Sequence, residues 1–431
     1  MSLIERSLSR IRKNLFCSAI IGILLILHLG IVYSIIAHSR PVIWSLHNDT
    51  VHRIGPRADF YAVYHAGVNL RQGISPYANN TDGITPYFYT FRYLPAVAQL
   101  GKFLTNLPPQ YAYLAWILFV EGMLMILIVS FWKHIEDKNL RVLSVGILLM
   151  SSPYFLELYM GQFTFAATSL VVVGLMIQGG MALFAVAVIL KVFPLILSPV
   201  LVLFRRLWPH LVMAVVSVVV LSLPYFLRHP ADWKFYYVSN FLAGTGCFHS
   251  GNYGFIYFIY LLANDLSLHG VLLNWIILVR YFRLFILTVT AIIVLLSKEK
   301  RIVIGVVVLY LAHFLTYSHV WEHHMSGVIV ISLMLFMIKH EKKWLIGLVI
   351  ACLVMLALPT PFVFFDEMKD PTIGDLAAIW PRYVSYLVLI PKVFPSLILF
   401  LLCMKLLCRH GFYSPIFVLG NALKSRFTDR G

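Results

Sequence analysis

The feature that most constrains this chain is its series of apolar runs, several of which are long enough to cross a lipid bilayer. A helix needs roughly 18 or more apolar residues to cross a hydrocarbon core of about 30 Å, and residues 15–37 exceed that length. Hydrophobic residues make up 60% of the 431 positions and charged residues only 12%, whereas soluble domains carry about 25% charged residues. The sequence therefore predicts an all-α fold, a polytopic transmembrane helical bundle.

The positive charge of the chain is better explained by membrane topology than by nucleic-acid binding. The formal net charge is +16, but the lysines and arginines are dispersed between apolar runs rather than gathered on one basic arm. Four basic residues precede the first apolar run, which is too long for a signal peptide and has no small-residue cleavage site. We therefore expect a retained first span, membrane lipids as the surroundings and no nucleic-acid partner.

Basic clusters recur in alternate loops between the apolar runs, and the positive-inside rule assigns these loops to the cytoplasm. The alternation predicts a cytoplasmic N-terminus at residues 1–14, a transmembrane domain at 15–406 and a cytoplasmic basic tail at 407–431. The polar segments between the basic loops then face the outside. The largest is a first extracytoplasmic loop, residues 38–110, whose tyrosines and tryptophan suit the headgroup level. We expect a multi-pass protein of the cell (inner) membrane.

Residues 181–204 interrupt this alternation, because a single crossing there would place the next two arginines outside. Lys191 and Pro194 lie in the middle of the segment, where proline removes a backbone hydrogen bond and a lysine in lipid is costly. We therefore expect a re-entrant hairpin broken at these two residues, with its irregular backbone lining a cavity. Lys191 can bind an anionic phosphate there, extend to the interface, or pair with a carboxylate such as Glu121 or Glu157.

A carboxylate in the first outer loop is the first candidate for chemistry. Asp59 lies just beyond the first span, and the same loop contains Arg92 and Tyr93. A carboxylate at the outer surface, beside a membrane cavity, can take a proton from a hydroxyl as that hydroxyl attacks, which is the role of a general base. Taken alone, such a residue is more often a solvated loop aspartate.

The second candidate is a histidine-rich segment, Tyr317–His324, between the end of one span and the start of the next. Its imidazoles can bind an anion, transfer a proton, ligate a metal, or form hydrogen bonds at the membrane interface. His323 and His324 are adjacent, and adjacent side chains of a helix point in different directions, so they form a poor metal-binding pair. We expect neither a metal nor another cofactor. Because no nucleotide-binding glycine motif is present, a lipid is the expected donor or cargo.

Seven short motifs follow one another along the chain. They are Asp59–Ala66, Gly73–Tyr77, Phe91–Pro95, Gly161-Gln162, Lys191–Leu195, Arg205–Trp208 and Trp321–His324. The ordered set resembles the polyprenol-phosphate-mannose-dependent mannosyltransferases of glycosyltransferase family 87, within the C-type superfamily of integral membrane glycosyltransferases. The resemblance runs over most of the chain and implies the fold of that superfamily.

The resemblance also implies roles for individual residues. Asp59 takes the place of the catalytic base, and Lys191, His323 and His324 are expected at the donor phosphate. The other expected substrate-binding residues are Tyr64, Arg92, Tyr93, Gln162 and Trp321.

The chain departs from the family pattern at two places. Leu94 stands where the family often has a proline, and Asn252-Tyr253-Gly254 stands where it has an Asn-Gln-Ser-like turn. The first change affects local backbone, whereas the second leaves no basis for carrying a substrate contact over to that turn.

These observations predict an enzyme, a hexosyltransferase that moves a sugar from a polyprenyl-phosphate-linked donor to a hydroxyl of a glycolipid or glycan acceptor. Mannose is the expected sugar, the extracytoplasmic face the expected location, and inversion at the anomeric carbon the expected outcome. Two other functions stay open at this point. One is a flippase or transporter of lipid-linked sugars, and the other is a non-catalytic scaffold of a membrane glycosylation complex.

Overall fold

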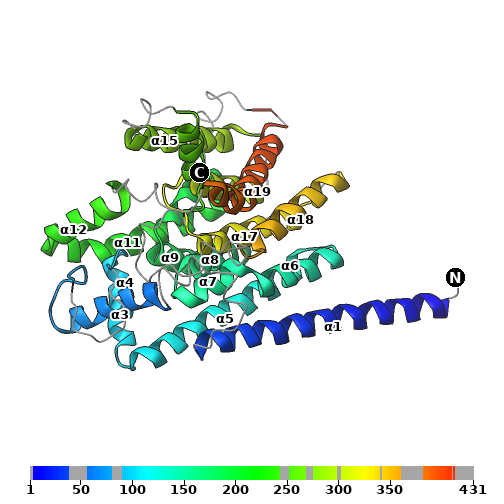
Figure 1. Cartoon of the computed structure of the whole chain (residues 1–431), viewed down its shortest axis with the longest axis horizontal. Helices are drawn as coiled ribbons and strands as arrows, with labels where there is room; N and C mark the ends of the chain where they lie inside the picture. Colours follow the sequence, from blue (N-terminus) through cyan, green and yellow to red (C-terminus); the bar gives the residue numbers. More distant parts are fainter. Residues whose placement is uncertain are drawn as a thin grey trace, which may run out of the picture.

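The computed structural model describes residues 3–37, 56–79, 90–242, 252–267, 275–298, 302–339, 342–360, 382–409 and 411–412. Within these ranges the elements are helices, and the one β-bridge is isolated, between Ser297 and Phe412. Figure 1 shows the helices as one bundle. The predicted all-α fold is confirmed.

Six segments of the described chain are long and apolar enough to cross a membrane: Cys17–Ile36, Pro109–His134, Lys138–Met160, Arg205–Arg228, Val279–Leu296 and Tyr386–Cys408. They lie in α1 (Leu3–Ile36), α5 (Pro109–His134), α6 (Lys138–Met150) with α7 (Ser152–Met160), α11 (Trp208–Arg228), α15 (Trp275–Leu296) and α19 (Arg382–Cys408). The chain is therefore an integral membrane protein, as predicted.

The spans differ in how much of their surface the rest of the bundle covers. The buried share of the apolar window is 17% in α15 and 72% in the α6–α7 segment. Shorter apolar helices pack inside: α8 (Thr164–Met176), α16 (Ile302–Thr316) and α17 (Met325–Leu333) are buried along almost their whole length. Figure 1 shows α7, α8 and α17 in the middle of the bundle, with α1 and α15 at opposite edges. A helix that is apolar all round belongs in such an interior.

The remaining elements are short. They are α3 (Ala58–Arg71), α4 (Pro95–Leu104), α9 (Met181–Leu190), η2 (Phe193–Leu197), α10 (Ser198–Leu203), η3 (Arg205–Leu207), α12 (Pro230–Tyr237), η4 (Val238–Leu242), α13 (Phe255–Asp265), η6 (Glu322–His324), η7 (Met334–Met337) and α18 (Lys343–Ala357). In Figure 1, α3, α4 and α12 lie at the end of the molecule opposite the N-terminus.

The helices of the predicted first loop, α3 and α4, pack against each other through two glycines. A Cβ atom on Gly67 would lie 2.2 Å from the backbone of Gly101, so any side chain there would force the helices apart. Residues 38–55 and 80–89 of the predicted loop lie outside the described residues. The described part gives α3 a fixed support, and α3 carries Asp59.

Two helices are interrupted inside the bundle. The α6–α7 segment breaks at Ser151, whose backbone is extended, two residues before Pro153. The other break follows α9: Lys191 is extended, with φ −145° and ψ 123°, and the 3-10 helix η2 begins at Phe193. The predicted break at Lys191 and Pro194 is confirmed, while the return of this hairpin to its own membrane face stays a prediction.

Candidate functional site

Asp59 stands in the first turn of α3, at a place where the backbone is strained. The preceding cap residue, Arg57, has φ 65°, a left-handed conformation that non-glycine residues rarely adopt. Three contacts hold it: its N–H donates to the Tyr159 carbonyl at 2.7 Å, its side chain donates to the Tyr61 hydroxyl at 3.2 Å, and its guanidinium lies 4.6 Å from the centre of the Tyr113 ring. These contacts fix the direction in which α3 starts.

Gly161 brings the end of α7 against the start of α3. Its φ is 70°, and a Cβ atom at this position would lie 2.4 Å from the Cβ of Phe60, so only glycine fits. The next residue, Gln162, consequently lies beside Asp59 and forms a hydrogen bond with its carboxylate. In the Gly161-Gln162 motif, the glycine therefore allows the close packing of α7 against α3, and this packing places the Gln162 amide beside Asp59.

Gln162 also connects Asp59 to the break after α9. Its Oε1 accepts hydrogen bonds from Lys191 Nζ at 3.0 Å and from the Tyr93 hydroxyl at 3.3 Å. Lys191 Nζ lies 5.0 Å from the centre of the Tyr93 ring, within the range of a cation–π interaction. His323 lies within the field of Lys191. The four residues Asp59, Gln162, Lys191 and His323 are called the Asp59 group below.

The environment of Asp59 changes its acidity. Enclosure by the protein raises the pKa of this carboxyl above its usual value, and the positive charges of Lys191 and Arg92 and the hydrogen bond from Gln162 oppose that rise. A carboxylate whose pKa is raised is a stronger base, so the shift favours proton abstraction from a hydroxyl.

Glu157 is a second buried carboxylate near Lys191. It is fully buried, and its two oxygens accept from the Phe165 N–H at 2.7 Å and from the Ser326 hydroxyl at 3.1 Å. Its charge acts on Lys191, and the charge of Asp59 acts on Glu157 in turn. The sequence suggests Glu157 only as one possible partner of Lys191, and its position inside a span is the signal that marks it. The other suggested carboxylate, Glu121, is bonded to His28 instead.

The two neighbouring histidines have different surroundings. His324 Nδ1 accepts a hydrogen bond from the backbone N–H of Trp321 at 2.9 Å. His323 is fully buried, and neither of its ring nitrogens has a hydrogen-bond partner in the described part of the chain. The two ring centres are 4.3 Å apart, and both rings lie in the field of Lys191. Because buried polar atoms are nearly always paired, the ring nitrogens of His323 can form hydrogen bonds to a ligand.

An ion pair that sequence reasoning missed supports this segment. Glu322 is fully buried and lies 3.2 Å from Nζ of Lys392 in α19. Lys392 also donates to the Leu356 and Leu358 carbonyls at the end of α18, the former at 3.0 Å. The pair therefore joins α18 and α19 to the turn that holds His323. A lysine in the middle of an apolar span is the signal that marks it.

Asn252 fixes the loop before the histidines. Its Nδ2 donates to the Ser318 carbonyl at 2.7 Å, and its Oδ1 accepts from the Val320 N–H at 3.0 Å. The Asn252-Tyr253-Gly254 turn, where the sequence departs from the family pattern, thus shapes the chain that leads to Trp321.

The other predicted substrate-binding residues are distributed around this group. Trp321 packs against Met160 and against Ala58, the residue that precedes Asp59 in the chain. Arg92 is exposed and acts on Asp59 through its charge. The hydroxyl of Tyr64 instead donates to the Leu107 carbonyl at 2.8 Å. Tyr64 therefore supports the packing of α3 and, in the described structure, has no hydrogen bond to the Asp59 group.

The structure thus brings together eight of the nine predicted site residues, from α3, the Arg92 loop, the turn after α7, the break after α9 and η6. Among the described residues, no three His, Cys, Asp or Glu side chains are grouped as metal ligands would be. The arrangement offers a base, a cation and a free imidazole around one amide. It can activate a hydroxyl and stabilise an anion at the same place.

A known protein family matches the chain. The family described as glycosyltransferase family 87 matches residues 91–318, more than half of the chain. The matched range contains Arg92, Tyr93, Gln162 and Lys191, whereas Asp59 and the Trp321–His324 segment lie outside it. No curated protein matches the chain.

Proposed function

The chain belongs to glycosyltransferase family 87, and from this premise we propose that it transfers a sugar from a polyprenyl-phosphate carrier to an acceptor hydroxyl. The observation that carries the proposal is the Asp59 group, in which a carboxylate and a lysine bind the same amide beside a buried imidazole without hydrogen-bond partners. A lipid-linked donor suits an integral membrane enzyme because it reaches such a site laterally from the bilayer.

In the proposed reaction the acceptor hydroxyl oxygen attacks the anomeric carbon of the sugar while Asp59 takes the hydroxyl proton. A new carbon–oxygen bond forms as the bond from the anomeric carbon to the phosphate oxygen breaks. That oxygen leaves with the bonding electrons, and the positive charge of Lys191 offsets the charge it gains. Attack and departure on opposite faces invert the anomeric configuration.

The remaining residues receive supporting roles in this proposal. His323 and His324 contact the donor phosphate, with His323 the stronger candidate because its nitrogens have no partner in the described structure. Arg92, Tyr93, Gln162 and Trp321 contact the substrates. Mannose is the proposed sugar, and a glycolipid or glycan the proposed acceptor.

The proposed orientation places residues 1–14 and 407–431 in the cytoplasm and the Asp59 group toward the extracytoplasmic side of the cell membrane. Two observations support it. Basic clusters alternate along the sequence, and α3 lies at the end of the molecule opposite the N-terminus (Figure 1).

The test is a transfer assay in membranes that contain the full chain, with a panel of radiolabelled polyprenyl-phosphate sugars and identification of the product by mass spectrometry. We expect transfer from the mannose donor and inverted stereochemistry in the product. Transfer from a nucleotide sugar but from no polyprenyl donor would refute the proposal.

Family membership argues against the transporter and scaffold alternatives. Cysteines introduced next to Lys191 test the transporter directly. Labelling from the extracytoplasmic face alone supports surface chemistry, whereas alternating access from both faces would support passage of a lipid-linked sugar.

A further inference from the structure

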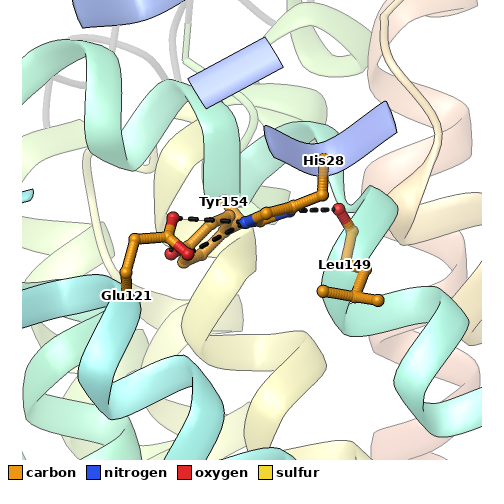
Figure 2. A network of polar contacts seen from close by, with 4 residues as sticks. All are labelled: His28, Glu121, Leu149 and Tyr154. Atoms are coloured by element: carbon orange, nitrogen blue, oxygen red, sulfur yellow. Dashed lines mark hydrogen bonds and ion pairs between the residues drawn. The ribbon is translucent and has the colours of Figure 1, made fainter. Parts of the chain in front are cut away.

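His28 is a buried imidazole in the C-terminal half of α1, and it joins that helix to three others. Only 1% of its surface is exposed. Figure 2 shows the ring between the Glu121 carboxylate of α5 and the Leu149 carbonyl of α6, with Tyr154 of α7 alongside. These four residues are called the His28 group below. Only 22% of the apolar window of α1 is buried in the bundle, and His28 lies in that covered part.

The contact with Leu149 has a cause in the sequence. In an uninterrupted helix the Leu149 carbonyl would accept from the N–H of residue 153, but that residue is a proline and has no N–H. The helix breaks there, at Ser151. His28 Nδ1 lies 2.7 Å from the carbonyl oxygen and donates to it, so an α1 side chain replaces the missing donor.

This hydrogen bond fixes the rest of the His28 group. Because Nδ1 carries a proton, Nε2 and the Glu121 carboxylate, 3.0 Å apart, must share one further proton between them. The Tyr154 hydroxyl donates to the same carboxylate at 2.8 Å, and its ring stacks on His28 with centres 5.7 Å apart. Every polar side chain of the group therefore has a partner.

The helix that follows the break, α7, ends at the candidate site. Three residues after Tyr154, α7 carries Glu157, and it ends at the turn formed by Gly161 and Gln162. Gly161 packs directly against the start of α3, since a Cβ atom there would lie 2.4 Å from the Cβ of Phe60. The direction of α7 therefore determines whether Gln162 reaches Asp59 and Lys191.

We propose that His28 is a positioning residue for sugar transfer: by donating to Leu149 it holds the α6–α7 break, and through α7 it places Gln162 against Asp59. The proposal rests on the proposed function for its kinetic consequence. Its structural consequence can be tested without any substrate.

Three substitutions separate the contacts of His28. In His28→Asn the amide N–H can replace Nδ1 toward Leu149, in His28→Gln it can replace Nε2 toward Glu121, and His28→Ala loses both. His134→Ala is the matched control, because His134 also bonds a backbone carbonyl, that of Ser130 at 2.8 Å, but is exposed at the end of α5.

Hydrogen exchange of the full chain in lipid nanodiscs, read by mass spectrometry, gives the structural result. We expect His28→Ala and His28→Gln to accelerate exchange in peptides that cover residues 148–162, and His28→Asn and His134→Ala to leave them near wild type. Three results would overturn the proposal. They are acceleration spread evenly over the chain, unchanged exchange in His28→Ala, and exchange in His28→Asn as fast as in His28→Ala.

Kinetics gives the second result. A misplacement of about 1 Å costs on the order of 10²-fold in rate. We therefore expect kcat of His28→Ala and His28→Gln to fall by about that factor, with little change in the donor KM. His28→Asn should retain most of the wild-type kcat. A loss of folded enzyme alone would leave kcat per folded molecule unchanged and would count against positioning. If the wild type transfers no sugar, the proposed function fails, and the exchange result still decides the role of His28.

Discussion

The Asp59 group and the His28 group are both polar clusters inside an apolar bundle, but they differ in how completely their hydrogen bonds are satisfied. In the His28 group each side chain has a partner, and the imidazole bridges two acceptors. In the Asp59 group His323 has none in the described structure, and burial raises the pKa of Asp59. Satisfied buried networks rigidify a structure, whereas an unsatisfied polar group beside a carboxylate and a lysine can bond to a ligand.

The difference teaches how the same residue types serve two purposes in one membrane protein. Both groups contain a carboxylate and an imidazole, so composition does not distinguish them. The His28 group lies where Pro153 interrupts a helix, and His28 donates the hydrogen bond to Leu149 that the proline cannot donate. The Asp59 group lies where α3 begins and where α7 and α9 end, and the ring nitrogens of its His323 have no partner in the described structure.

The largest effect should come from Asp59→Asn. An aspartate that acts as general base contributes roughly 10²- to 10⁴-fold to the rate, and asparagine cannot take the proton. We expect transfer of radiolabelled mannose from the polyprenyl donor to fall by that factor, with donor binding retained. Asp137→Asn is the control, because Asp137 is an exposed cap of α6 and asparagine caps equally well. Wild-type turnover in Asp59→Asn would remove this residue from the mechanism.

A large effect on stability should follow from Lys392→Met. This change leaves the Glu322 carboxylate buried without its cation, and breaking a buried pair costs about 3–5 kcal/mol. The Lys392→Met/Glu322→Gln double variant should recover much of that loss, because no charge is left unpaired. The free energy of unfolding in detergent measures both. Equal stability of Lys392→Met and wild type would show that the pair is not formed.

A smaller effect, of about 10²-fold on kcat, is expected for His323→Ala, by analogy with the loss of one donor to a developing anion. His324→Ala should cost less, because His324 is already bonded to the Trp321 backbone. Kinetics of both single variants and the double variant decide the order. Unchanged turnover in all three would make the histidines structural and would remove the distinction between the two groups.

The smallest effect should be a shift in pH dependence. Lys191 and Arg92 lower the pKa of Asp59, so their removal lets that pKa rise further. Asp59 then stays protonated to higher pH, and the acid limb of kcat/KM moves toward higher pH. The shift should be larger in Lys191→Met than in Arg92→Gln. An acid limb that stays in place in both variants would show that it does not report Asp59.

Much of the fold was predictable because hydropathy acts over short stretches of chain. Long apolar runs indicated the spans, and Lys191 with Pro194 indicated the interrupted helix, since proline removes a hydrogen bond wherever it stands. The break at Ser151 follows from the same chemistry at Pro153, but it was not predicted, because the hydropathy of residues 138–160 is that of a single span.

The sequence proposed the residues of the candidate site but not the contacts between them. Asp59, Gln162 and Lys191 were expected at one site, whereas Tyr64 proved to support packing near Leu107. The role of Gly161 against Phe60 could not be foreseen, because a close approach between two helices leaves no mark beyond one glycine.

The sequence by itself determined that this protein lies in a membrane, that a helix is interrupted at Lys191 and which polar residues are available. The tertiary structure decided which carboxylate meets which cation: Glu121 bonds His28, Glu322 pairs with Lys392, and Glu157 lies in the field of Lys191. The physical reason is distance along the chain. Hydropathy and proline chemistry are properties of neighbouring residues, while the pairing of charges from different helices depends on how the whole bundle packs.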